Sequence, residues 1–295
     1  MRPYINIVTS EHRKAVKKLY KRILTIQDIS CVGQCSLTVA LPILSAAGLE
    51  TAILPSAVLS NHTGGFSGWT FTDLTEDMPK IRERWEQEKL GFAAVYTGYL
   101  GSAKQIDYVK DIVKSRLAEG GRFIVDPAMA DNGKLYAGFD SDFVEAMKRL
   151  VFSADIILPN VTEAALLTDT EYRETYDSSY TDELTDKLLK NGAKTIVFTG
   201  ISYKPETTGV LIVENGKKSY YEHRKISGGC HGTGDVYASA FVGALENGFA
   251  PFDAAKIAAD YTVECIEITQ EDSSHWYGVM FEAAIPSYIK ALKLI

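Results

Sequence analysis

The 295-residue sequence is poor in cysteine, in positive charge and in long apolar stretches. Its four cysteines, at positions 31, 35, 230 and 265, are too few for a disulfide scaffold at this length, which predicts reduced thiols. A net charge of −7 argues against a nucleic-acid partner, whose binding surface would be basic. No stretch has the apolar length of a membrane span, and the basic segment 11–22 stands where a signal peptide would need an apolar core. We therefore expect a cytoplasmic protein that binds neither membranes nor nucleic acids.

Several nucleotide-binding motifs are absent as well. The sequence contains no GxxxxGK[ST] loop, no GxGxxG after its first strand and no pair of HRD and DFG motifs. These absences exclude a P-loop enzyme and a protein kinase, and they disfavour an NAD-dependent reductase. Any phosphate-binding site in this chain must therefore be built from a different motif.

Short apolar, β-branched runs alternate with amphipathic helical stretches along most of the chain. Strands are predicted at 22–29, 51–59, 91–100, 122–127, 155–160 and 194–200. Runs that are apolar throughout favour a parallel sheet covered on both faces. We expect an α/β fold in three layers, with helices on both sides of a mostly parallel sheet. Residues 1–21 are predicted to form a basic lead-in helix and 22–295 a single domain.

Three other segments have clear patterns. The stretch 102–120 is predicted to be a helix that stops on Gly120-Gly121. The stretch 208–226 is predicted to be a hairpin, with Asn215-Gly216 as its turn. From Val236 onward the chain is predicted to be mostly helical.

The segment 228–235 reads GGCHGTGD and directly precedes a predicted helix. Gly232 and Gly234 allow the backbone to turn and to approach a ligand without a Cβ in the way. The N–H groups at the helix start, together with the positive end of the helix dipole, favour an anion. Asp235 in the first turn can accept a proton from an attacking hydroxyl, as phosphoryl transfer to an alcohol requires. A plain N-cap formed by Thr233 or Asp235 is the alternative interpretation.

Cys230 and His231 in the same segment suggest a zinc site or a thiol catalyst, and we reject both. Zinc sites show paired ligands at recognisable spacing, and no second cluster accompanies these two residues in the sequence. Adjacency in the sequence does not make a nucleophilic Cys–His dyad, because the two side chains must converge in space.

Acidic and amide side chains follow two predicted strands. Asp126 and Asp131 come after 122–127, and carboxylates of this kind bind Mg²⁺ or face a polyphosphate. Asn160 and Glu163 end a strand and begin a helix. Glu163 is either a surface residue that complements the helix dipole or, beside Asp126, a residue that orients metal-bound water.

Taken together, the motifs resemble the ribokinase-like superfamily, and most closely its pyridoxal kinase branch. The resemblance extends from Ile23 to Glu267 and rests on SNHTG (60–64), TGYLGSA (97–103), DPAM (126–129), LPNVTEA (158–164) and GTGD (232–235), in that order. It implies a ribokinase-like fold and a transferase that uses ATP to phosphorylate the 5′-hydroxymethyl group of a B6 vitamer, in vitamin B6 salvage.

For the phosphate side, the resemblance implies that Asp235 is the catalytic base and that the backbone of Gly232, Thr233 and Gly234 forms the anion hole. Mg²⁺ and the ATP phosphates would lie against a set of polar side chains, namely Asn160, Glu163, Asp126 and Asp131. Thr199 would stand on the nucleotide side. Mg²⁺ would bind together with ATP, the co-substrate. The resemblance leaves open whether a monovalent cation binds as well.

For the vitamin side, the resemblance implies that His62 and Thr63 approach the substituted pyridine ring and that Tyr99 packs against it, since offset stacking suits a flat heteroaromatic. Asp28 departs from the pattern, because pyridoxal kinases of this type usually carry Ser at this point. A carboxylate there can accept a hydrogen bond from a protonated ring nitrogen or attract the amine of pyridoxamine. The sequence therefore favours pyridoxamine or broad vitamer specificity.

Other activities share parts of this pattern. Hydroxymethylpyrimidine kinases of the same superfamily also carry an aspartate near position 28, and other members phosphorylate other small alcohols. A protein of another class, a non-catalytic vitamin-binding protein, could keep the same pocket. The resemblance implies a homodimer, and the loop 200–207 and the hairpin near 215 are candidates for a segment that closes over the substrates.

Overall fold

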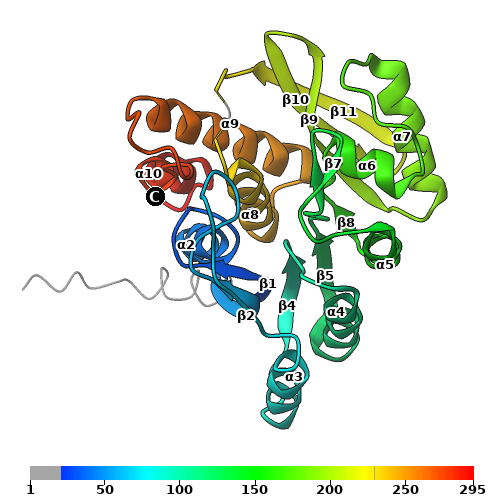
Figure 1. The fold of residues 1–295 in the computed structure, drawn as a ribbon, viewed down its shortest axis with the longest axis vertical. Coiled ribbons are helices and arrows are strands. Elements are labelled where there is room, and N and C mark those ends of the chain that lie inside the picture. The colour runs from blue at the N-terminus through cyan, green and yellow to red at the C-terminus, as the bar shows by residue number, and fades with distance from the viewer. Residues whose placement is uncertain (1–20, 229) are drawn as a thin grey trace, which may run out of the picture.

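A nine-stranded sheet forms the centre of the computed structural model, which describes residues 21–228 and 230–295 (Figure 1). Its strand order is β11-β10-β9-β8-β5-β4-β1-β2-β3. The strands are β1 (Arg22–Ser30), β2 (Glu50–Leu59), β3 (Phe71–Asp73), β4 (Phe92–Thr97), β5 (Leu117–Val125), β8 (Ile156–Ile157), β9 (Thr195–Lys204), β10 (Thr207–Glu214) and β11 (Lys217–Arg224). A separate small ribbon pairs β6 (Ala130–Asp131) with β7 (Lys134–Leu135). The run from β2 to β9 is parallel, and the strands at both ends are antiparallel, which confirms the predicted mostly parallel sheet.

Helices cover both faces of this sheet and complete the three layers (Figure 1). One layer consists of α2 (Leu37–Ala46), α8 (Thr233–Glu246), α9 (Pro251–Gln270), the short 3-10 turn η1 (Glu282–Ala284) and α10 (Ile285–Ala291). The other consists of α3 (Met78–Gln87), α4 (Ala103–Arg116), α5 (Ser141–Val151), α6 (Val161–Leu167) and α7 (Ser178–Lys190). The predicted α/β class and the helical segment after Val236 are therefore confirmed. The predicted lead-in helix at 1–21 lies outside the described residues, apart from Lys21.

Three predicted segments were wrong. The loop expected at 200–207 is mostly strand, because β9 continues to Lys204 and β10 begins at Thr207. The helix expected to reach Gly120 ends at Arg116, because Leu117 is extended and pairs with Phe92 as β5 begins. The strand expected over 155–160 keeps ladder pairing only at Ile156–Ile157, since the chain then turns through Pro159 into α6.

The hairpin was predicted correctly. Asn215 and Gly216 adopt φ values of 51° and 76°, which suit the two-residue turn between β10 and β11. Because β9 also pairs with β10 in antiparallel fashion, the hairpin extends this end of the sheet.

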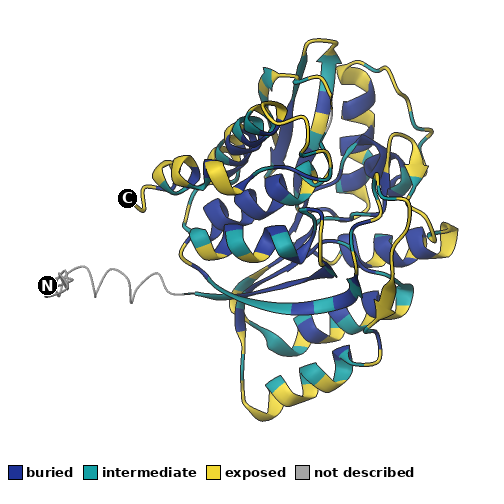
Figure 2. Cartoon of the chain, turned by 60° about the vertical axis from the view of Figure 1, so that its left-hand side comes forward, coloured by how far each residue is buried: buried dark blue, intermediate teal, exposed yellow. Residues whose placement is uncertain are grey.

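Helix α8 is the inner helix of its layer, and every residue from Val236 to Glu246 is buried. Its apolar length packs on the sheet and on α2 and α9, and Figure 2 shows the buried interior beneath an exposed outer surface. The first turn of α8 therefore has a fixed position above the carboxyl ends of the parallel strands, where an open α/β sheet binds its ligands.

Candidate active site

The GTGD segment forms the N-terminus of α8. Gly232 precedes the helix with φ 81°, and a Cβ at this position would stand 2.0 Å from the backbone oxygen of Gln34. Only glycine therefore allows the two backbones to come so close. A Cβ on Gly234 would meet nothing within 4 Å, so the space over the first turn is open. The first N–H groups of a helix lack partners within the helix, and here they border that open space.

Asp235 lies in this first turn as a partly buried carboxylate. Burial and the charge of Asp28 raise its pKa to about 7, against the lowering effect of the hydrogen bond from the Ser36 backbone amide. No Lys, Arg or His side chain pairs with Asp235 within the part of the chain that the structure describes. A carboxylate with a pKa near neutrality, next to an anion-binding helix start, suits a general base. It is not the simple N-cap of the alternative interpretation, because α8 has no side-chain cap hydrogen bond.

Asp126 and Glu163 lie near Asp235 at the neighbouring strand ends. The backbone N–H of Asp126 donates to Thr97 at 2.9 Å, which continues the β4–β5 pairing past the end of the ladder. Burial and the charges of Glu163 and Asp235 raise the pKa of Asp126 well above its usual range. Burial also raises the pKa of Glu163, and the charge of Asp131 adds to the effect. The structure thus gathers carboxylates that repel one another.

Glu163 also has a structural role that the sequence did not reveal. It forms a capping box with Asn160, in which each side chain accepts the other's backbone N–H, at 2.9 and 3.0 Å. Its second oxygen accepts the N–H of Met129 at 3.1 Å, and the Asn160 amide donates to Ala130 at 2.9 Å. These bonds lock the start of α6 to the loop after β5, so both expected ligand residues are held rigidly.

The remaining phosphate-side residues have contrasting environments. Asp131 is exposed and accepts two hydrogen bonds from Asn132, at 2.9 and 3.0 Å, in the tight turn between β6 and β7. Thr199 is half-buried in β9, and its N–H donates to Pro159 at 2.9 Å. Thr199 therefore stands beside the start of α6, next to Asn160.

His62 is buried and fixed by hydrogen bonds on both ring nitrogens. Its Nδ1 accepts the N–H of Gly64 at 2.9 Å, and its Nε2 lies 2.8 Å from the backbone oxygen of Tyr277. Nδ1 must carry a lone pair and Nε2 the proton, so the ring is neutral, in agreement with the lowering of its pKa by burial. A Cβ on Gly33 would stand 1.9 Å from the ring, which explains why glycine occupies that position.

Asp28 and Tyr99 lie on the same side of the site as His62. Asp28 is buried at the end of β1 and accepts a hydrogen bond from Ser30 at 3.0 Å. Burial raises the pKa of Asp28, while Ser36 and Ser30 lower it. The charge of Asp28 contributes to the raised pKa of Tyr99, whose ring also stacks on Phe139 at 5.4 Å. Thr63, the fourth residue expected at the vitamin ring, is exposed.

Sequence reasoning missed Ser36 and the segment near the C-terminus. Ser36 has φ 54°, an unusual backbone for a non-glycine residue, and it lies between the carboxylates of Asp28 and Asp235. The backbone oxygen of Tyr277 contacts His62 in the loop after β2, and Gly278 presses against the loop after β1, where a Cβ on Gly278 would stand 2.4 Å from Gln34. Nothing in the sequence indicated that these loops contact residues more than 200 positions away.

The donor set fits a magnesium ion that arrives with its nucleotide. Within 21–228 and 230–295, no three His, Cys, Asp or Glu side chains are arranged to hold a metal together. Mg²⁺ commonly binds through one or two carboxylates and keeps waters and phosphate oxygens as its other ligands. The half-buried carboxylate of Asp126 and the buried carboxylate of Glu163, which lack a cationic partner among the described residues, match that mode.

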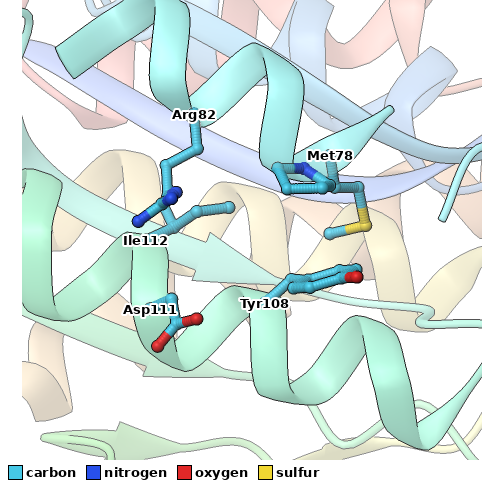
Figure 3. A pocket seen from close by; sticks show the side chains of 6 residues that line it. Met78, Arg82, Tyr108, Asp111 and Ile112 are labelled. Atoms are coloured by element: carbon cyan, nitrogen blue, oxygen red, sulfur yellow. The ribbon is translucent and has the colours of Figure 1, made fainter. Parts of the chain in front are cut away.

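A shallow hollow elsewhere on the surface lies between α3 and α4 (Figure 3). Met78 and Arg82 come from α3, and Tyr108, Asp111 and Ile112 face them from α4. None of the residues that line it belongs to the group of carboxylates formed by Asp126, Glu163 and Asp235. The candidate catalytic residues therefore lie at the strand ends and not in this hollow.

Similar proteins share most of this chain. The family model for phosphomethylpyrimidine kinase matches residues 57–280. The pyridoxal kinase of Dictyostelium discoideum is 28% identical over 239 residues, covering 75% of this chain and 77% of that protein. The structure of pyridoxal kinase from Lactobacillus plantarum has a TM-score of 0.84 and 31% identity, over 92% of this chain and 97% of its own. A provisionally assigned phosphomethylpyrimidine kinase from Bacteroides thetaiotaomicron, solved with pyridoxal, has a TM-score of 0.86 and 33% identity, over 91% and 95%.

Proposed function

The chain belongs to the phosphomethylpyrimidine kinase family, within the ribokinase-like superfamily, and we propose that it phosphorylates the 5′-hydroxymethyl group of a B6 vitamer with ATP. The observation that carries the proposal is the carboxylate of Asp235, without a cationic partner in the described chain, at the open N-terminus of α8. The pyridoxal kinase relatives and the relative solved with pyridoxal support the substrate class.

Asp235 is the base of the proposed reaction. The substrate oxygen forms a bond to the γ-phosphorus of ATP, the bond from that phosphorus to the β–γ bridging oxygen breaks, and ADP leaves. The hydroxyl proton passes to the Asp235 carboxylate, whose pKa of about 7 suits uptake near neutral pH. The N–H groups of Thr233 and Gly234 face the transferring phosphoryl group, where the helix dipole favours negative charge.

The polar side chains opposite Asp235 form the proposed nucleotide side. Asp126 and Glu163, with Asp131 at the rim, would hold Mg²⁺, which when bound neutralises charge on the ATP phosphates. Asn160 and Thr199 would line the nucleotide, and the capping box keeps the start of α6 in place for this purpose. A monovalent cation at the phosphates is a further expectation from the family resemblance.

The vitamin would bind on the side of Asp28, His62, Thr63 and Tyr99. Hydrogen bonds on both ring nitrogens hold the neutral His62 ring in one orientation. The ring therefore has a fixed position beside the substrate. Asp28 would accept a hydrogen bond from a protonated ring nitrogen or from the amine of pyridoxamine. This carboxylate favours pyridoxamine or broad B6 specificity.

The cellular setting follows from the same resemblance. No helix among the described residues is long and apolar enough to cross a membrane. We propose a cytoplasmic homodimer, with ATP and the vitamer as its small-molecule partners.

A substrate panel tests the proposal. ADP release is measured with Mg²⁺ and ATP in the presence of pyridoxal, pyridoxine, pyridoxamine, hydroxymethylpyrimidine or ribose. We expect the highest kcat/KM with a B6 vitamer. Faster turnover of hydroxymethylpyrimidine or ribose would assign the chain to a related small-alcohol kinase, and vitamer binding without ADP release would indicate a non-catalytic binding protein.

The Asp28→Ser variant on the same panel tests the vitamer preference. A hydrogen bond to a charged group contributes about 1.5–3 kcal/mol, so we expect kcat/KM for pyridoxamine relative to pyridoxal to fall about tenfold or more. An unchanged ratio would contradict the role given to Asp28.

A further inference from the structure

We infer that three tyrosines, Tyr176, Tyr203 and Tyr220, hold an irregular stretch of β9 in the shape that ATP binding needs, and that Tyr176 is a positioning residue for the nucleotide. The inference rests on the proposed function, which places Thr199 on the nucleotide side. The three tyrosines lie outside the five sequence motifs that carry the family resemblance.

The irregular stretch consists of two successive bulges in β9. The pairing of β9 with β10 joins Phe198 to Leu211, Ile201 to Gly209 and Lys204 to Thr207. Between these pairs, two residues of β9 oppose one residue of β10, namely Thr199 and Gly200 against Val210, and then Ser202 and Tyr203 against Thr208. A bulge interrupts the ladder and redirects side chains, which makes it a common device next to active sites. The first bulge contains Thr199.

Side chains supply hydrogen bonds that the interrupted ladder leaves open. The hydroxyl of Tyr176 accepts the N–H of Ser202 at 3.1 Å and donates to the oxygen of Gly200 at 3.4 Å. The hydroxyl of Tyr220, from β11, donates to the oxygen of Ile201 at 3.1 Å. Three consecutive residues of the double bulge are therefore bonded to tyrosine hydroxyls that approach from different elements.

Tyr203 joins the two tyrosines into one packed group. Its ring centroid lies 6.3 Å from that of Tyr176 and 5.3 Å from that of Tyr220. Its hydroxyl is 2.7 Å from that of Thr181 in α7. The group thus fastens the double bulge to α7, and Tyr176 itself lies just before that helix.

The same stretch is fastened to the phosphate side through Thr199. The N–H of Thr199 donates to Pro159, one residue before Asn160 and the start of α6. A bulge held at both ends presents Thr199 in a single arrangement, so the nucleotide does not have to order it on binding. Without the Tyr176 hydroxyl, the N–H of Ser202 and the oxygen of Gly200 lose their partner, and the bulge can relax away from that arrangement.

The test compares two Tyr→Phe variants that each lose one hydroxyl. Tyr176→Phe removes both of its hydrogen bonds to the bulge, so it is expected to raise KM for ATP about three- to tenfold, with kcat and KM for the vitamer unchanged. The matched control is Tyr180→Phe, since the Tyr180 hydroxyl donates to the oxygen of Glu171 at 2.7 Å and not to the bulge. The control should leave KM for ATP unchanged, even if it lowers Tm by a similar amount.

Calorimetric titration with ATP separates this inference from the proposed function. No ATP binding by the wild-type chain would overturn the proposed function and the inference with it. Wild-type binding that Tyr176→Phe matches in affinity would overturn the inference alone, as would an equal loss of affinity in Tyr180→Phe. If Tyr176→Phe does not fold, Tyr220→Phe takes its place, with a smaller rise in KM for ATP because it loses one bond instead of two; an unchanged KM in that variant would contradict the inference.

Discussion

Helix α8 carries a carboxylate near each end, and the two carboxylates have different charged neighbours. At the C-terminal end, the Glu246 side chain is 1% exposed, and its two oxygens pair with Lys21 at 3.0 Å and Arg122 at 2.9 Å. At the N-terminal end, Asp235 has no cation beside it in the described chain, and its neighbour Asp28 is another acid. The paired carboxylate of Glu246 stabilises the fold, whereas the carboxylate of Asp235, which has no cationic partner in the described chain, is typical of a residue at a functional site.

The helix dipole sharpens the contrast. The negative end of α8 disfavours the charge of Glu246, so two cations are needed to offset both burial and the dipole. The positive end favours ionised Asp235, and it does the same for a bound phosphate. Helix α8, from Thr233 to Glu246, therefore carries a reactive acid at its positive end and a structural acid at its negative end.

The largest expected effect comes from Asp235→Asn. The amide keeps the size of the side chain but cannot accept the proton, so we expect kcat to fall by about two orders of magnitude or more. Calorimetry should show vitamer and ATP affinities close to those of the wild type. Tm should not fall, because the variant removes a shielded charge. Near-normal turnover in this variant would remove Asp235 from the mechanism.

Glu246→Gln should have the opposite effects to Asp235→Asn: it should lower stability and leave turnover unchanged. Removing one partner of a buried ion pair is costly, but Lys21 and Arg122 are 35% and 44% exposed and regain water. We therefore expect a loss of about 1–3 kcal/mol in the free energy of unfolding, below the cost of a fully buried pair. Urea unfolding measures this loss, and kcat/KM should stay unchanged. A large drop in turnover with intact stability would show that the two ends of α8 are not divided as described.

Asp28→Ser should produce the smallest of these effects and acts on the pKa of Asp235. The wild-type kcat/KM is expected to rise with pH and to reach half its maximum at about pH 7, as Asp235 loses its proton. The charge of Asp28 raises the pKa of Asp235, so the variant should lower that pKa and move the half-maximum to lower pH. The measurement is the pH profile of kcat/KM with pyridoxine. A shift to higher pH would contradict the electrostatic account.

The sequence predicted the parts of the site that depend on local pattern. The strand pattern implied that Glu163 could lie beside Asp126 at neighbouring strand ends, and the structure places the two residues there. The GTGD glycines predicted a close backbone approach, which is found at Gly232. These features could be predicted because strand direction and glycine geometry are properties of short segments.

Contacts between distant segments could not be predicted in the same way. Lys21 and Glu246 are 225 positions apart, and neither residue type indicates a partner. The bond from His62 to the backbone of Tyr277 depends on where the chain passes after α9, which no local pattern encodes. The sequence indicated a helix start at Asn160 and Glu163, but the bond that Glu163 accepts from Met129 requires the loop after β5 to be in place.

Phosphorus NMR of the wild-type reaction with pyridoxal, ATP and Mg²⁺ tests the central claim most directly, because ADP release alone does not distinguish transfer from hydrolysis. Our account predicts a new phosphate monoester signal, split by the two protons of the 5′-methylene group, that grows as the γ-phosphate signal of ATP disappears. New signals from ADP and inorganic phosphate alone would contradict transfer to the vitamer, and an unchanged spectrum would contradict kinase activity toward pyridoxal.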